Sequence, residues 1–435
     1  MRVVTPLLAS LRRCFDAFPD GRKGIRPDSQ YAMADFGMAA FSVFFMQSPS
    51  FLAHQARLEE GHGRSNATTL FGLTKIPCDS STRSMLDPAK PELLHPVFAD
   101  LMVEIERTDG LSAFRRLGEH MLIALDGTEY HNSYKIHCPQ CSKRERSNGK
   151  TEYFHAVLAA TVVAPGSNRV IPLEPEFIVP QDGAAKQDSE IAAGKRWLKI
   201  HGARYSRLRP IYLGDDLFAH QPFCKDVLAS GGHFLFTCKP ATHTLIREYI
   251  AGVELPTHEE KIRRGKARVT HRYRWFCDVP LRDGEDALHV NWLEIDIIDA
   301  TGKVTYRNSF ITDLPVTREN VVEFVECGRA RWKIENETFN VIKTKGYNVE
   351  HNFGHGKKNL SCILLVLNLL AFAFHTACDL HDELWQRVRM KLSTRRRFFS
   401  DLASITSYVI FSSWTELLET LAFERPSPIL PPRPP

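Results

Sequence analysis

Three acidic side chains lie in or beside predicted secondary-structure elements where metal-dependent phosphate chemistry would need them. Asp126 ends the apolar run 121–126, Asp215 lies near the end of the run 210–216, and Glu335 lies in a later helical segment. Carboxylate oxygens are the ligands that Mg²⁺ prefers. Two such ions, about 3.5–4 Å apart, activate a water and stabilise the leaving oxygen when a phosphodiester is cleaved. The three acids are therefore candidate catalytic residues and Mg²⁺ ligands.

Two neighbouring acids compete for these roles. Asp216 follows Asp215 directly, and Glu337 lies two residues after Glu335. Positions 335 and 337 do not share a face of a helix, so only one of them should point toward the other acids. Taken singly, an Asp after a strand is more often a turn residue or a helix cap, and a helical Glu is more often a solvated charge. Only the ordered set of acids indicates a metal site.

The elements that must position these acids follow a definite order along the chain. Apolar and β-branched segments predict strands, and segments with helical spacing separate the later strands. Three antiparallel strands followed by alternating helices and parallel strands are typical of an α/β fold with an RNase H-like core. In that topology the first and fourth strands are neighbours, so their terminal acids converge. The predicted strands are 121–126, 153–164, 170–179, 210–216 and 233–239, with helices near 188–205 and 219–230.

The remaining chain divides by composition into further regions. Alternating aromatic and β-branched residues predict strands in the segment that follows the core strands. The predicted division is a helical N-terminal region, 1–115; the first part of an RNase H-like catalytic core, 116–239; a β-rich insertion domain, 240–316; the remainder of the core, 317–385; and a basic and proline-rich C-terminal tail, 386–435.

Three blocks of the sequence resemble bacterial DDE transposases of the insertion-sequence-four type. ALDGTEY resembles the block around the first Asp of that family, and IYLGDD resembles the second block. RWKIENETFN resembles the last block, in which an Arg lies four residues before the catalytic Glu. The resemblance covers roughly residues 20–380. It implies that Asp126, Asp215 and Glu335 are catalytic and bind two Mg²⁺ ions, with Mn²⁺ as a substitute.

The sequence departs from this family at two positions that contact DNA phosphates there. The family usually has a Tyr three residues before the Arg, where this chain has Gly328. It usually has a Lys seven residues after the Glu, where this chain has Ile342 followed by Lys343. These departures put the DNA contacts in question more than the acids.

The resemblance implies a DNA transposase, which cleaves the ends of an insertion sequence and transfers them into target DNA. Its partners would be the terminal inverted repeats and target DNA, with a homodimer on the DNA and with residues 1–115 as a region for binding DNA ends. The alternatives are a structure-selective nuclease without strand transfer and an inactive DNA-binding descendant of a transposase. Cations would bind phosphates and an aromatic ring would stack on a base; the candidates are Arg331, Lys333, Lys343, Lys345 and Trp275.

A second metal site is conceivable in the segment 131–155. Cys138 and Cys141 form a CxxC pair, with His137 and His155 as candidate partners. Such a turn presents two thiolates to one tetrahedral ion, and a pair of histidines completes a structural zinc site. A single CxxC is equally compatible with two reduced thiols and no metal. The sequence leaves both interpretations open.

Charge and hydropathy are compatible with a DNA enzyme of the bacterial cytoplasm and nucleoid. The net charge of +5 permits a polyanionic partner without requiring one. Ten cysteines and an N-terminus without a long apolar core predict reduced thiols in the cytoplasm. The apolar run 360–378 is interrupted by Asn368 and His375, so we predict a buried helix there and no membrane association.

Overall fold

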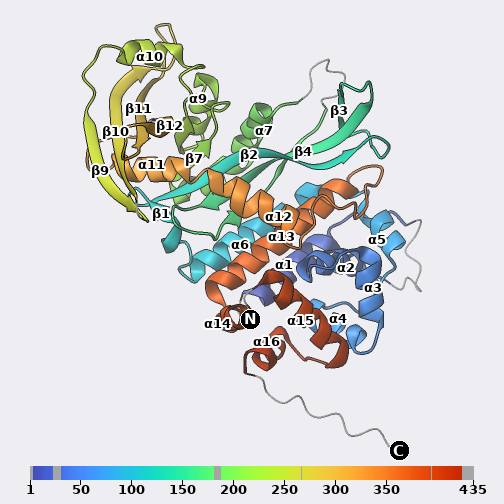
Figure 1. Ribbon diagram of the computed structural model, residues 1–435. Coiled ribbons are helices and arrows are strands. Elements are labelled where there is room, and N and C mark those ends of the chain that lie inside the picture. Colours follow the sequence, from blue (N-terminus) through green and yellow to red (C-terminus); the bar gives the residue numbers. More distant parts are fainter. Residues whose placement is uncertain (1–2, 23–30, 181–187, 266, 393, 424–435) are drawn as a thin grey trace, which may run out of the picture. The chain divides into compact units, whose positions relative to one another are not determined.

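The computed structural model shows a mixed α/β protein with one large mixed sheet and many helices (Figure 1). It describes residues 3–22, 31–180, 188–265, 267–392 and 394–423. The chain forms two compact units. Unit 1 comprises Met1–Gly110, Glu129–Ala156 and Phe339–Pro435, and unit 2 comprises Leu111–Thr128 and Val157–Thr338. The proline-rich part of the predicted tail, from residue 424, lies outside the described residues.

Unit 2 contains the neighbouring strands that position Asp126 and Asp215. β2 (His120–Ser133) pairs in parallel with β7 (Pro210–Gly214), and β7 pairs in parallel with β8 (His233–Thr237). β4 (Thr151–Val163) borders β2 on its other side. All residues of β7 are buried, as expected for a parallel strand that is covered on both faces. The predicted neighbour relation between the first and fourth core strands is therefore present.

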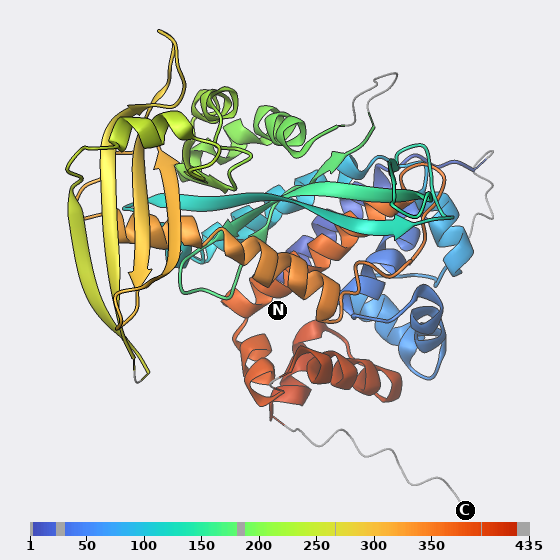
Figure 2. The same ribbon diagram turned by 45° about the horizontal axis from the view of Figure 1, so that its top comes forward.

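The remaining strands of unit 2 lengthen this sheet. Two short strands, β5 (Ile171–Pro172) and β6 (Glu176–Ile178), pair with β4, and β1 (Arg115–Arg116) pairs with β2. Beyond β8 the order continues as β12, β11, β10 and β9, joined by antiparallel pairs. Figure 2 shows these four strands, yellow to orange, side by side. They lie in the predicted β-rich segment and have the bounds β9 Thr257–Arg264, β10 Ala267–Pro280, β11 His289–Ile298 and β12 Val304–Thr312.

Helices of unit 2 pack against this sheet and bring in further candidate residues. α9 contacts β8, and α11 contacts β8, β10 and β11. α7 runs on through a π-helix, Leu198–Gly202, into a short α8. The late helical segment is also interrupted, because a π-helix at Ile334–Phe339 follows α11. The helices are α7 Glu190–Trp197, α8 Ala203–Tyr205, α9 Gln221–Ala229, α10 Thr244–Ile250 and α11 Val321–Arg329, with 3₁₀ turns at Ser112–Phe114 and Ser206–Leu208.

Unit 1 is mainly helical and includes the hairpin of β3 (Ser142–Glu145) with the first part of β4. Its long helix α13 packs against α2 and α6. The helices of unit 1 are α1 Val4–Asp16, α2 Met33–Phe45, α3 Phe51–Glu59, α4 Gly63–Phe71, α5 Asp79–Leu86, α6 His95–Arg107, α12 Asn340–Thr344, α13 Leu360–His381, α14 Glu383–Lys391, α15 Arg395–Tyr408 and α16 Trp414–Phe423, with a 3₁₀ turn at Pro91–Leu94.

The apolar helix α13 is a core helix of unit 1. It is long and apolar enough to cross a bilayer, yet 94% of its most apolar window is buried within the protein. The two residues that interrupt its apolar run both bind Tyr347. Asn368 Nδ2 donates to the Tyr347 carbonyl at 2.8 Å, and His375 Nδ1 lies 2.7 Å from Tyr347 Oη. Burial lowers the pKa of His375 well below its usual value, so the helix core stays uncharged.

Candidate active site

The register of the parallel strands brings the first two candidate acids together. Ala124 of β2 is paired with Leu213 of β7. Two residues further along each strand, the same register aligns Asp126 with Asp215. Both residues belong to unit 2. Asp126 lies within β2, which continues to Ser133, just beyond the last pair of its parallel ladder with β7, and Asp215 directly follows β7. Functional side chains of open α/β sheets converge where parallel strands end, as β7 does here. The strand order in the sequence predicted this juxtaposition, but the predicted end of the first strand at Asp126 was wrong, because β2 continues to Ser133.

Glu335 is held to Asp126 by an arginine that both carboxylates share. Arg331 Nη1 lies 3.1 Å from Asp126 Oδ2, and Arg331 Nη2 lies 2.8 Å from Glu335 Oε1. The Arg331 side chain is 12% exposed and that of Asp126 is 17% exposed, so little water competes for this pair, whereas the Glu335 side chain is 42% exposed. Glu335 lies in the π-helix Ile334–Phe339, a distortion that is frequent at functional sites. The structure thus brings Asp126, Asp215 and Glu335 into one cluster.

A fourth carboxylate, Glu190, joins the cluster from the first turn of α7. Its negative charge contributes to the raised pKa of Asp126, and Asp215 in turn raises the pKa of Glu190. Gly127 makes this approach possible, because a Cβ at that position would lie 2.3 Å from Glu190 Oε1. Sequence reasoning missed Glu190, since it lies at the start of a helix with no motif around it. The glycine directly after Asp126 was the available signal.

The site has more negative charge than its one arginine neutralises. Burial raises the pKa of Asp126 to about 7; Arg331 opposes this shift, while Glu335, Glu190 and Asp215 add to it. Burial also raises the pKa of Glu190. Carboxylates crowded in this way are stabilised by a divalent cation, and oxygen ligands suit Mg²⁺ or Mn²⁺. The donor set therefore fits the metal that the sequence predicts.

The raised pKa of Asp126 predicts a pH-dependent gain in stability for Asp126→Asn. The folded pKa, about 7, exceeds the unfolded value of about 3.9, so the folded protein binds more protons between these two pH values. The free energy of unfolding of wild type should therefore fall as pH rises through this window. The variant has no carboxyl group at this position, so its free energy of unfolding should not fall for this reason. We expect the variant to be more stable than wild type at pH 8 by at least about 1.4 kcal/mol, but close to it at pH 4. Urea unfolding in buffer without Mg²⁺ measures the free energy of unfolding of both proteins at each pH. An equal difference between variant and wild type at pH 4 and at pH 8 would contradict the prediction.

The two alternative acids, Asp216 and Glu337, do not share the interactions of Asp215 and Glu335. Asp216 is 7% exposed, and its carboxylate accepts hydrogen bonds from the Lys239 backbone nitrogen (2.5 Å) and the Thr242 hydroxyl (2.6 Å). It thereby fixes the turn that follows β8, which makes it a poor substitute for Asp215 as a metal ligand. Glu337 shares the π-helix with Glu335, but Arg331 pairs with Glu335. The geometry favours Asp215 and Glu335 over these neighbours.

Comparisons with known proteins leave the family open. No protein-family model matches the chain, and no curated protein matches it. Seven chains of solved structures match. One comes from the cryo-EM structure of the piggyBac transposase synaptic complex with hairpin DNA. It is similar to this chain with a TM-score of 0.40 and 9% sequence identity, over 98% of this chain and 80% of that one. This is a distant likeness, and the insertion-sequence group that the sequence resembles is not identified by it.

The predicted DNA-binding residues belong to both units and have different surroundings. Arg331 is engaged by the two acids, and Lys343 Nζ pairs with Glu350 at 3.0 Å. Lys345 is exposed. Trp275 is only 8% exposed, because the strand β10 buries it in the sheet, so its ring is not accessible for stacking on a base. Lys333 lines a cavity in unit 2 together with Arg329 and Trp332.

Gly328, where the family that the sequence resembles usually has a Tyr, is required by helix packing. A Cβ at this position of α11 would lie 2.6 Å from Cε1 of Phe310 in β12. The helix therefore packs against the sheet with no room for a larger residue.

The CxxC pair belongs to a four-residue cluster in unit 1. Cys138, Cys141 and His155 lie together, but the fourth member is His355 and not the predicted His137. The His137 ring is exposed and stacks on Tyr153, with ring centroids 4.2 Å apart. The sequence could not show His355 as a partner, since it lies 214 residues beyond Cys141.

Proposed function

We propose that this protein is a DDE transposase of an insertion sequence, which cleaves transposon ends in a metal-dependent reaction and transfers them into target DNA. The observation that carries the proposal is the carboxylate cluster of Asp126, Asp215 and Glu335, built on the adjacent parallel strands β2 and β7, in which Arg331 links Asp126 to Glu335. The order of β4, β2, β7 and β8, with β5 and β6 beside β4, supports an RNase H-like core. The insertion-sequence-four assignment rests on the sequence blocks around these acids.

The residues of the chain have distinct roles in this reaction. Asp126, Asp215 and Glu335 would bind two Mg²⁺ ions, or Mn²⁺ in their place, and Glu190 would add a fourth carboxylate. Bound ions would activate a water and stabilise the leaving oxygen. Arg331 orients Asp126 and Glu335 through its two terminal nitrogens.

Two phosphoryl transfers make up the proposed reaction. In the first, water attacks the phosphorus at the transposon end, the bond from phosphorus to the 3′ oxygen breaks, and a free 3′-hydroxyl leaves. In the second, this hydroxyl attacks a target phosphodiester and displaces the target's 3′ oxygen. One new phosphodiester replaces the broken one, so no covalent protein–DNA intermediate is needed.

A cavity in unit 2 with several basic lining residues supports the proposal of DNA binding. Some of these residues are neighbours of Arg331 in the sequence. The cavity has a volume of about 690 Å³ and its lining includes Arg116, Arg329, Lys333 and Trp332. The Trp332 side chain is 52% exposed, which makes it available for stacking on a base in the way first expected of Trp275. Arg and Lys side chains beside an exposed aromatic ring suit a phosphate backbone with unpaired bases. The proposed DNA-bound form is a homodimer in the bacterial cytoplasm, holding two transposon ends.

A strand-transfer assay tests the proposal directly. The substrate is DNA that ends in the inverted repeats flanking the gene, either intact or already cleaved, together with a supercoiled target plasmid. We expect Mg²⁺-dependent cleavage of the intact ends and joining of the precleaved ends to the plasmid. Cleavage without joining would instead identify a structure-selective nuclease. Specific binding without either reaction would identify an inactive DNA-binding descendant.

A further inference from the structure

Four buried side chains of unit 1 meet at one point, from three separate segments of the chain. Cys138 and Cys141 lie in the turn between β2 and β3, His155 lies on β4, and His355 lies in the loop before α13. One ligand atom from each residue lies within 4.8 Å of every other. This cluster is distinct from the carboxylates, which belong to unit 2.

Four distances within the cluster match the edges of a tetrahedral coordination shell. Zn–S bonds of about 2.3 Å and Zn–N bonds of about 2.0–2.1 Å give tetrahedral edges of about 3.8 Å between sulfurs and about 3.5 Å between sulfur and nitrogen. The Cys138 and Cys141 sulfurs lie 3.9 Å apart. His155 Nε2 lies 3.5 Å from Cys138 Sγ and 3.4 Å from Cys141 Sγ, and His355 Nε2 lies 3.5 Å from Cys141 Sγ.

We infer that Cys138, Cys141, His155 and His355 bind one structural zinc ion. Two thiolates and two imidazoles form a closed N₂S₂ set, which leaves no position for water or substrate, so the ion would not be catalytic. The separation of the two sulfurs is well beyond the disulfide bond length of about 2.05 Å, so the thiols are not oxidised to each other.

The loop that carries His355 is built to hold one conformation. Gly354 and Gly356, on either side of His355, have φ values of +143° and +71°, which residues with side chains rarely adopt. A Cβ at Gly356 would lie 2.3 Å from Asp87 Oδ1. Asp87 in turn accepts hydrogen bonds from four successive backbone nitrogens, those of residues 357–360. The imidazole is therefore positioned by the backbone, as a preorganised ligand should be.

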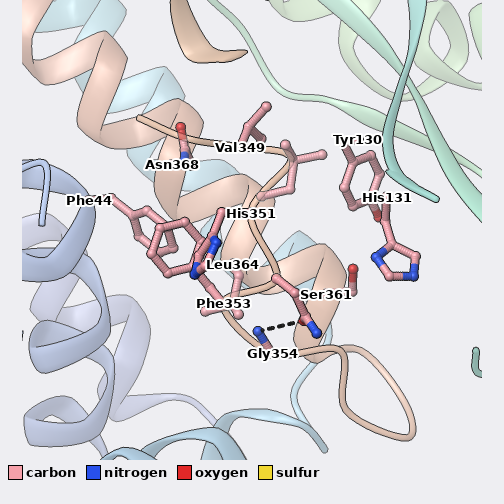
Figure 3. A pocket seen from close by; sticks show the side chains of 12 residues that line it. Phe44, Tyr130, His131, Val349, His351, Phe353, Gly354, Ser361, Leu364 and Asn368 are labelled. Carbon is pink, nitrogen blue, oxygen red and sulfur yellow. Dashed lines mark hydrogen bonds between the residues drawn. The ribbon is translucent and has the colours of Figure 1, made fainter. Parts of the chain in front are cut away.

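The surroundings of the cluster are closely packed. The His131 ring lies 4.4 Å from the His355 ring, between centroids. Figure 3 shows His131 and Ser361 with Phe353 and Gly354 around a cavity of about 30 Å³, enough for about one water. A dashed line there marks the 3.2 Å hydrogen bond from the Gly354 nitrogen to Asn352 Oδ1. All four ligand side chains are themselves buried, so bulk water has little space beside them.

The ion would join parts of the chain that are distant in sequence. Segment 129–156 and segment 339–435 both belong to unit 1, and Cys141 and His355 are 214 residues apart. A cross-link between distant residues removes much conformational freedom from the unfolded chain. A hydrogen bond of 2.8 Å from Gln140 Nε2 to Asn359 Oδ1 is a second tie between the same two segments. Zinc should therefore stabilise unit 1.

The decisive experiment compares the metal content of two histidine variants. Wild type, His355→Ala and His137→Ala are purified in the presence of zinc, dialysed and measured by mass spectrometry of the metal. We expect one zinc ion per chain in wild type and in His137→Ala, and at least a tenfold lower content in His355→Ala. His137 is the matched control, because it lies beside Cys138 in sequence but outside the cluster. Loss of zinc in His137→Ala with retention in His355→Ala would overturn the proposed ligand set.

A second measurement on the unaltered protein covers the case in which His355→Ala does not fold. Metal-free, reduced wild type is titrated with Co²⁺, whose visible absorption reports coordination geometry. We expect saturation at one ion, with the intense bands of a tetrahedral site and a thiolate charge-transfer band, and displacement by one equivalent of Zn²⁺. Wild type that binds neither Zn²⁺ nor Co²⁺ after reduction would overturn the proposal. Neither measurement depends on DNA cleavage, so the zinc proposal is tested independently of the transposase proposal.

Discussion

We expect Asp126→Asn and Glu335→Gln each to lower the rate of Mg²⁺-dependent DNA cleavage by about 10³-fold or more. Metal-assisted stabilisation of a phosphoryl transfer is worth several kcal/mol, and each 1.36 kcal/mol is about a tenfold change in rate. Either substitution removes a carboxylate charge from a site in which Arg331 already links both residues at 3.1 and 2.8 Å. Single-turnover cleavage of repeat-ended DNA at saturating protein measures the effect.

Glu337→Gln is the matched control for this experiment. Glu337 lies on the same π-helix as Glu335, and its substitution by Gln removes the same charge. Arg331, however, pairs with Glu335. The rate of Glu337→Gln should stay within about threefold of wild type, because an ordinary surface substitution changes energies by about 0.5 kcal/mol. If Glu335→Gln and Glu337→Gln lowered the cleavage rate equally, the effect would come from the loss of negative charge on the helix and not from the loss of a metal ligand. If Asp126→Asn cleaved DNA at the wild-type rate, the assignment of Asp126 as a catalytic metal ligand would be wrong.

The strand framework of the site could be predicted because its signals are local. An apolar run that ends in an acid is visible in 121–126 and in 210–216, and both runs form neighbouring parallel strands, although β2 continues past Asp126 to Ser133 and Asp215 follows the end of β7. The long apolar run 360–378 was correctly predicted as a buried helix, since Asn368 and His375 are tolerable there only with a partner. Tyr347 supplies that partner to both.

What the sequence could not show depends on tertiary contacts. Asp215 and Asp216 are chemically the same, and only the turn after β8 shows that Asp216 is bound by Lys239 and Thr242. Trp275 lies in a segment of alternating cations and aromatics that also suits an exposed surface, yet the sheet buries it. His355 is distant in sequence from its cluster partners, and only its flanking glycines hinted at a constrained loop.

Gly127→Ala is expected to impair cleavage about 10–100-fold without unfolding the protein. An alanine Cβ would lie 2.3 Å from Glu190 Oε1, so the Glu190 carboxylate must move away from Asp126. Residues that support metal ligands typically change metal affinity or activity by about that factor. The Gly127 backbone is not in the left-handed region, and alanine is not disfavoured in its conformation, so thermal stability should remain near wild type. The effect is measured as the Mg²⁺ concentration required for half-maximal cleavage, together with the maximal rate.

A double-mutant cycle with Glu190→Ala separates this cause from a general disturbance of β2. If Gly127→Ala acts by displacing Glu190, removing the Glu190 side chain should by itself reproduce most of the loss. Adding Gly127→Ala to Glu190→Ala should then change the rate little, because the atoms that would collide are gone. Fully additive losses would show that Gly127 matters for the strand or for Asp126 itself, and that Glu190 contributes independently. A non-additive cycle would place Glu190 in the site as a fourth functional carboxylate, at a position that no sequence motif marks.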